Sequence, residues 1–338
     1  MIKKFIFSAC ILVLLISAEF LLSRWINAYH YQLLLNIGIN AILAVSLNLL
    51  NGFTGQFSLG HAGFMAIGAY ASAAITYYGG PLLEPWLGTA LLARLILFIF
   101  ALLWAMGLAG LAGLLVGIPT LRLRGDYLAV ATLGFGEIIR VVILNLDFVG
   151  GARGFSVLVE HELRSLAIIM GFLVLTVIVI GRIVYSPYGY GFRAIHNDEL
   201  AANVLGIHTT RLKTSAFVIS AVFAGLAGFL FAHSQGYVHT NSFTFLKSFE
   251  IVAMVILGGM GSITGSILAA TLLTLLPEWL RGLPEAVRQF GEFRMVIYAL
   301  LLIVLMRFRP QGLLGFREWN WDSITQGIRM IKRIGVKT

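Results

Sequence analysis

The feature that most constrains this chain is a series of apolar runs, each long enough to cross a lipid bilayer. A membrane-spanning helix needs about 20 mostly apolar residues. Runs of this kind lie at 5–22, 31–50, 91–118, 166–184, 214–232 and 295–306. Segments interrupted by glycine or polar residues lie at 59–78, 127–146, 249–262 and 265–279. The sequence therefore predicts an all-α polytopic bundle of about eight to ten spans.

The composition excludes most soluble classes of protein. Hydrophobic residues make up 59% of the 338 residues and charged residues only 12%, about half the usual share in soluble domains. So few polar side chains cannot cover a surface of this size in water, which argues against a soluble enzyme, a nucleic-acid-binding domain or a disordered chain. The single cysteine, Cys10, leaves no disulfide and no cysteine-based metal site within one chain.

The positive charges predict the orientation. An even number of spans places both termini on one side, and 15 of the 24 Lys and Arg residues fall on that side. Because such residues concentrate in cytoplasmic loops, we expect both termini in the cytoplasm. An arrangement of eight spans, with the interrupted segments merged, keeps this orientation. The run at 5–22 is interpreted as an uncleaved first span, with a signal peptide as the alternative.

The end of the chain differs from the rest, so we divide it into a membrane domain at 1–315 and a cytoplasmic tail at 316–338. Trp321, Ile324, Ile328 and Ile331 recur in the tail at helical spacing, with basic residues between them. This pattern fits an amphipathic helix lying on the anionic inner leaflet. A basic tail without helical structure is the alternative.

The largest hydrophilic loop, at 185–213, predicts a short helix between spans. Asn197 or Asp198 can cap its N-terminus, where Asp198 and Glu199 also suit the helix dipole. Gly206 is a suitable stop. Its apolar face comprises Ala201, Ala202, Val204 and Leu205. Since about two turns are too few to span a membrane, this face needs a partner, either another subunit or the chain's own loops.

Two glycine-rich segments, at 54–73 and 256–270, predict broken helices in the two halves of the chain. Irregular backbone at membrane depth is tolerated only inside protein or beside a water-filled cavity. Paired broken segments are typical of a transport path. The candidate path residues are Gln56, Ser58, Gly60, His61, Gly63, Gly258, Gly259 and Gly261. The alternative is that the glycines permit close helix packing.

The remaining polar residues form no catalytic constellation. Glu137 and Arg140 lie three apart in a span and are either functional or a structural ion pair, with Arg140 otherwise reaching the outer interface. His233 and His239 lack a third ligand at suitable spacing, so we predict no metal site. Because the sequence has no Walker A motif, we expect no bound cofactor, and any ATP must be bound by another chain.

Five blocks of this sequence resemble the inner-membrane permeases of ABC importers for branched-chain amino acids, of the LivM type. They are TGQFSLGHAGFMAIGAY, LRLRGDYLAVATLGFGEIIR, GFRAIHNDELAANVLGIH, ILGGMGSITGS and RFRPQGLLG. The loop and the glycine blocks are shared with ribose and urea relatives, whereas the LRLRGDY block is more specific to LivM-type and urea-type permeases. Asp126 departs from the uncharged residue expected after Gly125.

The resemblance implies a permease subunit of the bacterial inner membrane that moves branched-chain amino acids and is not itself an enzyme. The implied partners are a LivH-like second permease, two ABC ATPase subunits and a periplasmic binding protein. In this family the hydrophilic loop is similar to the coupling helix that docks on the ATPase. The residues assigned to coupling are Arg193, Asp198, Glu199, Ala201, Ala202, Leu205 and Gly206.

Other functions stay open at this point. An ABC permease for urea, short amides or a sugar would differ little in sequence. An ATP-independent secondary transporter would usually carry charged residues within its spans to bind a coupling ion, and Glu137 and Arg140 are the candidates deep enough for that role. A purely structural membrane subunit is disfavoured by the polar, glycine-broken segments.

Overall fold

The computed structural model describes residues 27–87, 91–123, 125–157 and 165–281, with a few positions between 300 and 315. The described helices are α2 (Ala28–Asn48), α3 (His61–Leu87), α4 (Leu91–Thr120), α5 (Asp126–Leu144), α6 (Leu166–Val184), α7 (Pro187–Asn197), α8 (Glu199–Val204), α9 (Thr209–Gln235), α10 (Phe245–Gly258) and α11 (Ile263–Arg281). The prediction of an all-α polytopic bundle is confirmed.

Short elements join these helices. A π-helix, η1 (Leu49–Phe53), follows α2, and 3₁₀ turns form η2 (Asp147–Val149), η3 (Gly151–Arg153) and η5 (Thr240–Phe243). Strand β1 (Phe155–Ser156) pairs antiparallel with β2 (Tyr237–Val238), so that Phe155 lies opposite Val238. This pairing ties the connection after α5 to the one after α9.

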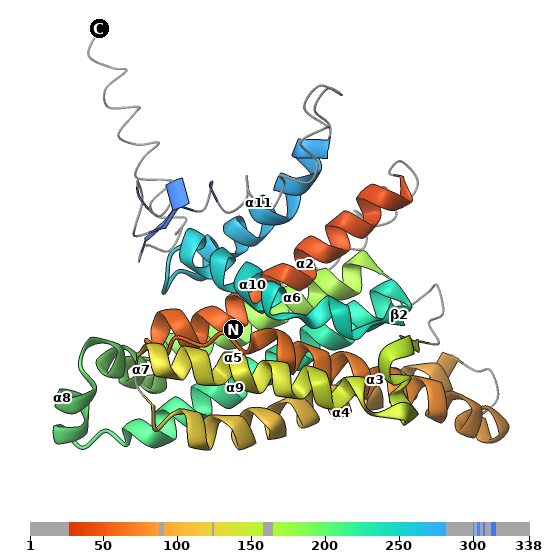
Figure 1. The fold of residues 1–338 in the computed structure, drawn as a ribbon, viewed down its shortest axis with the longest axis horizontal. Coiled ribbons are helices and arrows are strands. Elements are labelled where there is room, and N and C mark those ends of the chain that lie inside the picture. Colours follow the sequence, from red (N-terminus) through yellow and green to blue (C-terminus); the bar gives the residue numbers. More distant parts are fainter. Residues whose placement is uncertain are drawn as a thin grey trace, which may run out of the picture.

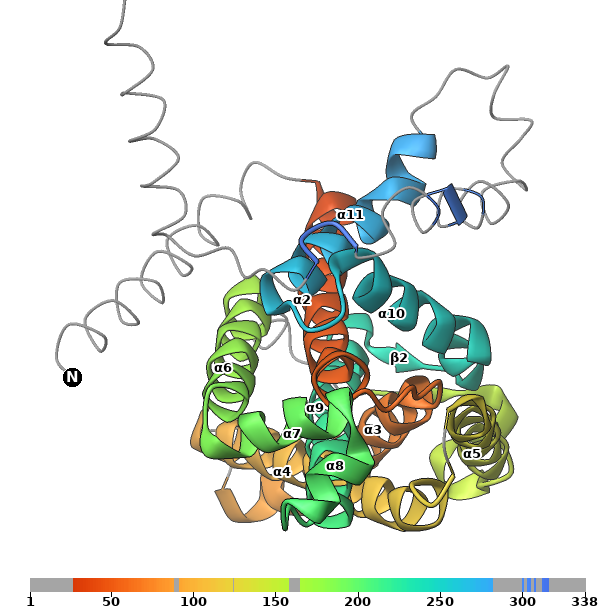
Figure 2. The ribbon, with the colours of Figure 1, turned by 90° about the vertical axis from the view of Figure 1, so that its left-hand side faces the viewer.

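Helix α2 passes through the centre of the bundle. It packs against α6, α9, α10 and α11, and Figure 2 shows it between α6 on one side and α10 on the other. In the most apolar 18-residue stretch of the span that begins with α2, 83% of the residues are buried, compared with 22% in the corresponding stretches of α4, α5 and α6. Helices α3, α4, α5 and α9 lie side by side, with α7 and α8 at one end and β2 at the other (Figure 1). The polar residues in the second half of α2, such as Asn40, Ser46 and Asn48, are therefore buried within protein.

Six helical segments among the described residues are long and apolar enough to cross a membrane. They are Ala28–Phe53, Arg94–Thr120, Asp126–Leu144, Leu166–Val184, Thr209–Gln235 and Thr240–Gly258, and Ile263–Trp279 is a shorter apolar helix. Large apolar side chains such as Leu103, Leu115 and Val130 are exposed on α4 and α5. In a bilayer such faces contact lipid, so their exposure agrees with the predicted spans.

The segment boundaries correct two predicted spans. The span predicted at 59–78 begins as a helix only at His61 and continues to Leu87. The span predicted at 249–262 begins earlier, at Phe245, and ends at Gly258 because the chain turns there. The predicted first span at 5–22 and the tail at 316–338 lie outside the described residues, as does most of the span at 295–306.

Candidate translocation and coupling sites

The connection between α2 and α3 is a broken helix, as the glycine-rich sequence predicted. The α-helix widens into η1 after Asn48, and residues 54–60 are not helical. This segment is buried except at Gly55 and Phe57, which satisfies the requirement that irregular membrane backbone lie inside protein. Gly55 has a φ of 69°, a conformation that is readily available only to glycine.

The three polar residues predicted for the path are buried but differ in their partners. His61 Nε2 lies 2.9 Å from Ser46 Oγ. The Ser58 amide donates to Asn51 Oδ1 at 3.1 Å. Gln56 is 4% exposed, and neither its Oε1 nor its Nε2 has a hydrogen-bond partner among the described residues. A buried unpaired polar group costs roughly 1–3 kcal/mol, so Gln56 has hydrogen-bonding capacity that the described residues leave unused, and its role in a path stays a prediction.

Gly60 and Gly63 lie where the beginning of α3 meets α5. A Cβ added at Gly60 would lie 2.3 Å from the Thr132 carbonyl oxygen, and one at Gly63 would lie 2.9 Å from Gly136 Cα. The Leu59 amide also donates to Thr132 Oγ1 at 3.0 Å. This geometry favours the packing interpretation for both glycines, and their role in a path stays a prediction.

The second glycine-rich segment forms the turn between α10 and α11. Gly259 and Gly261 have φ values of 109° and 87°, which other residues rarely adopt. Gly258 faces Gly265 across the turn, and a Cβ at Gly258 would lie 2.5 Å from the Gly265 carbonyl carbon. The three glycines predicted for the path in this half of the chain therefore build a tight reversal of the backbone.

Asn48 joins the two glycine-rich segments. Its Oδ1 accepts from the Gly261 amide at 2.9 Å. Its Nδ2 donates to the Ser262 carbonyl at 2.8 Å and to Ser266 Oγ at 2.9 Å. Gly52, in η1, approaches the same turn so closely that an added Cβ would lie 2.3 Å from the Gly261 nitrogen. We call Asn48, Gly52 and the turn at 258–262 the glycine joint.

The sequence did not single out Asn48. Asn48 is a buried amide near the C-terminal end of the apolar run at 31–50. This polar residue within an apolar run is the only feature of the sequence that could have identified it. Its partners lie more than 200 residues away along the chain, so their identity required the fold.

Glu137 and Arg140 form an ion pair that holds the N-terminus of α10. Arg140 Nε lies 2.7 Å from Glu137 Oε2, and Glu137 Oε1 accepts from the Phe245 amide at 2.9 Å. The carboxylate thus satisfies a free amide in the first turn of α10, at the positive end of its dipole. This geometry supports the structural interpretation of the pair over an ion-coupling role.

A further ion pair lies on α10 itself. It was not predicted from the sequence, because the span was predicted to begin only at residue 249. Lys247 Nζ donates to Glu250 Oε2 at 3.0 Å and to Asn40 Oδ1 at 3.1 Å. Asn40 Nδ2 in turn donates to Thr274 Oγ1 at 2.9 Å. Positive and negative groups therefore lie together within the Thr240–Gly258 span, where ionisable residues are costly and commonly mark a transport path.

The hydrophilic loop folds into α7 and α8, which confirms the predicted short helix. Asp198 caps α8, since its Oδ1 accepts from the amides of Leu200 at 2.8 Å and Ala201 at 3.1 Å. Gly206 follows the helix with a φ of 83°, as expected for a C-terminal stop. Glu199 Oε1 pairs with Lys213 Nζ at 2.5 Å, which ties α8 to α9. Helix α8 is therefore fixed at both ends.

The apolar residues of α8 point in two directions. Ala202 is 2% exposed and packs within the chain, so it does not belong to the outward face predicted for it. Val204 and Leu205 are 88% and 79% exposed, and Leu200, which the sequence did not indicate, is 63% exposed. Ala201 is exposed as predicted. We call Leu200, Val204 and Leu205 the α8 surface.

Arg193, the remaining residue predicted for coupling, lies on α7. Its guanidinium lies over the rings of Tyr185 and Tyr190, at 5.7 and 5.9 Å from their centres. Both tyrosines are exposed, so Arg193 belongs to a polar and aromatic rim beside α8, at one end of the bundle (Figure 2).

Comparison with known proteins places this chain in a family. Residues 30–306 match the family described as the permease component of the branched-chain amino acid transport system. The chain is 36% identical to the permease protein LivM of Salmonella typhimurium and 37% identical to that of Escherichia coli, over 93% of this chain and 75% of each relative. The Escherichia coli permease protein LivH is 30% identical over 50% of this chain and 53% of its own length. No solved structure shows a significant match. The chain thus belongs to the branched-chain amino acid transport permease family, and it is a multi-pass inner-membrane protein.

Proposed function

We propose that this chain is one permease subunit of an ATP-driven importer for branched-chain amino acids. Its partners in the proposal are a LivH-like second permease, two ABC ATPase subunits and a periplasmic binding protein. The observation that carries the proposal is the α8 surface. Exposed apolar residues gathered on one short element outside the spans mark a site of protein interaction.

The α8 surface cannot be buried by a small movement of its own helix. The Asp198 cap, the Gly206 stop and the ion pair to Lys213 hold α8 in place. A partner that covers Leu200, Val204 and Leu205 must therefore come from another subunit or from a part of this chain outside the described residues. An ATPase subunit docked there would supply the ATP chemistry for which this sequence has no Walker A motif.

The relatives support the solute and the second permease. Those named LivM and LivH are both described as permease proteins of high-affinity branched-chain amino acid transport. Two distinct permeases named for one transport activity are consistent with a paired membrane assembly. Urea, short amides or a sugar remain the alternative solutes, and the ATP-independent secondary transporter remains the alternative class.

Polar groups for the solute are present within the spans. An amino acid is a zwitterion, so its path needs groups of both signs close together. Lys247 and Glu250 provide them 3.0 Å apart, with their side chains 21% and 37% exposed. Gln56 adds an amide with no partner among the described residues. We infer that these three residues, from the α2–α3 break and from α10, are the polar contacts of the path.

The deciding experiment is Leu205→Asp in the complete importer. A charge buried at a docking surface without a partner costs several kcal/mol, so the ATPase should dissociate and ATP-dependent uptake should fall at least about 100-fold. Asn203→Asp is the matched control, because Asn203 is exposed on the same helix but lies outside the α8 surface. Uptake, membrane abundance and ATPase co-purification are measured together.

The outcomes separate the competing functions. Normal abundance with loss of both uptake and bound ATPase supports the importer. Full ATP-dependent uptake by Leu205→Asp would show that α8 is not the docking element. Uptake that persists when the ATPase subunits are deleted identifies a secondary transporter instead.

A further inference from the structure

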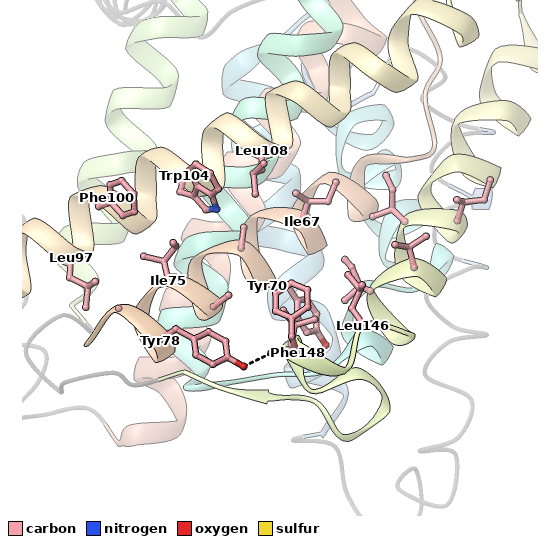
Figure 3. Close-up of a pocket in the computed structure, with 18 residues that line it drawn as sticks. Ile67, Tyr70, Ile75, Tyr78, Leu97, Phe100, Trp104, Leu108, Leu146 and Phe148 are labelled. Atoms are coloured by element: carbon pink, nitrogen blue, oxygen red, sulfur yellow. Dashed lines mark hydrogen bonds between the residues drawn. The ribbon is translucent and has the colours of Figure 1, made fainter. Parts of the chain in front are cut away.

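A pocket of about 890 Å³ lies between α3, α4 and α5. Figure 3 shows side chains from the three helices converging on it, with Leu97, Phe100, Trp104 and Leu108 of α4 along one wall and Ile75 of α3 opposite. Its size falls within the range of about 300–1,000 Å³ typical of small-molecule sites. We call it the α4–α5 groove. It was not predicted from the sequence.

The groove offers no free tyrosine hydroxyl to a ligand. The Tyr78 hydroxyl donates to the Phe148 carbonyl at 2.6 Å, and the Tyr70 hydroxyl donates to the Val238 carbonyl at 3.5 Å. No charged side chain is among the lining residues. A zwitterionic amino acid would lose its hydration here without compensation, so the groove is no part of the solute path and its ligand must be apolar.

The groove opens toward the surface that faces the bilayer. Phe100 and Trp104 of α4 are 52% and 46% exposed, and Ile138 and Val142 of α5 are 55% and 51% exposed, although all four line it. These residues lie on two spans, α4 and α5, whose exposed sides carry apolar side chains along the helix. Inside a membrane, the molecules that reach such an opening are lipid acyl chains.

The length of the groove matches one leaflet. Along α4 it extends from position 97 to position 108, a difference of eleven positions, which is about 16 Å at a rise of 1.5 Å per residue. The hydrocarbon core is about 30 Å thick, so one leaflet contributes about 15 Å. A membrane-spanning helix would need a groove that extends through both leaflets. The α4–α5 groove instead ends near Leu108, while α4 continues to Thr120.

The groove lies in the half of the bundle away from α7 and α8. Phe148 and Val149, which line its end, belong to η2 near the β1–β2 pair, at the opposite end of the bundle from α8 (Figure 1). The proposed function places α8 in the cytoplasm. The groove then belongs to the outer leaflet. Only this choice of leaflet rests on the proposed function.

We propose that the α4–α5 groove binds an acyl chain of an outer-leaflet phospholipid. The chain lies along α4 from Leu97 to Leu108, between the aromatic rings of α4 and the apolar side chains of α3 and α5. The site is separate from the solute contacts on α10 and from the α8 surface.

The test counts phospholipid retained by the full-length purified protein. Native mass spectrometry after detergent extraction should find bound phospholipid on the wild type. Ala71→Phe and Ala74→Phe each fill the groove from the α3 wall and should reduce retention about tenfold, the effect of losing contact with roughly two methylene groups. Leu111→Phe and Leu115→Phe are the controls, because both residues are exposed on α4 but do not line the groove.

A second measurement guards against a filled variant that folds poorly. Delipidated protein is titrated with dioleoyl phosphatidylglycerol or dioleoyl phosphatidylethanolamine, and its melting temperature is followed. Addition should raise the melting temperature of the wild type and of Leu111→Phe but not that of Ala74→Phe. A response to both lipids identifies the acyl chain as the ligand, as proposed, whereas a response to one headgroup alone would contradict it.

Other results would overturn the proposal. Wild-type protein that retains no phospholipid, or filled variants that retain as much as the wild type, would do so. So would a cross-link from Ala74→Cys to another protein chain or to residues 1–26, because a protein segment would then occupy the groove. None of these results bears on Leu205→Asp, so failure here leaves the proposed function intact.

Discussion

The two glycine-rich segments of this protein look alike in sequence and are built differently. The segment before α3 meets α5 through backbone contact, where Gly60 and Gly63 leave no space for a side chain. The segment between α10 and α11 also lacks space, but Asn48 holds it with three hydrogen bonds from another helix. Glycine content therefore predicts close approach in both places, but the polar contacts differ: Thr132 Oγ1 accepts one hydrogen bond, from the Leu59 amide, at the first contact, whereas Asn48 makes three at the second.

The difference matters for function, because the two contacts respond differently to change. A contact made mainly by shape, with the single Leu59–Thr132 hydrogen bond across it, can shift along its partner more readily when α3 and α5 move. A contact fixed by hydrogen bonds to a buried amide has one favoured geometry, since each broken bond leaves a polar group unpaired. We therefore expect the glycine joint to move as a unit and the beginning of α3 to be the more adjustable surface.

The largest expected effect is that of Gly258→Val. A β-branched side chain there would meet the Gly265 backbone, with Cβ only 2.5 Å from its carbonyl carbon, so α10 and α11 would have to separate. We expect more than about 4 kcal/mol of destabilisation and little folded protein in the membrane. Gly134→Val is the matched control, since an added Cβ there meets nothing within 4 Å. Equal membrane abundance of the two variants would show that the α10–α11 turn tolerates opening.

Asn48→Leu should have the next largest effect. It removes the acceptor of the Gly261 nitrogen, leaving that group unpaired at a cost of roughly 1–3 kcal/mol, and it removes one of the donors to the Ser262 carbonyl, which keeps its bond from the Ser266 amide. The melting temperature in detergent is the measurement, with Asn145→Leu as the control, because Asn145 is exposed and bonds only within its own helix. If the two variants have the same melting temperature, the glycine joint is held by its shape, and the contrast with the segment before α3 disappears.

The class of fold follows from the sequence because lipid allows few solutions. Backbone groups in a bilayer must be satisfied within the chain, so long apolar runs become helices. The cap and stop of α8 were also predictable, since Asp198 and Gly206 act on neighbouring residues. The orientation of Ala202 was not, because which face of a six-residue helix is covered depends on the helices beneath it. The start of α10 was missed for a related reason, since Glu137 of α5 caps the Phe245 amide.

The smallest expected effect is that of Gly60→Ala, and it bears on the path most directly. The added methyl would lie 2.3 Å from the Thr132 carbonyl, so α3 and α5 must shift slightly, at about 1–3 kcal/mol. If Gly60 serves packing, membrane abundance and uptake should fall together, and uptake per molecule should stay at the wild-type level. A variant with normal abundance but reduced uptake per molecule would place Gly60 on the path, as its sequence context first suggested. Gly171→Ala is the control, because Gly171 lies within α6 with nothing inside 4 Å of an added Cβ.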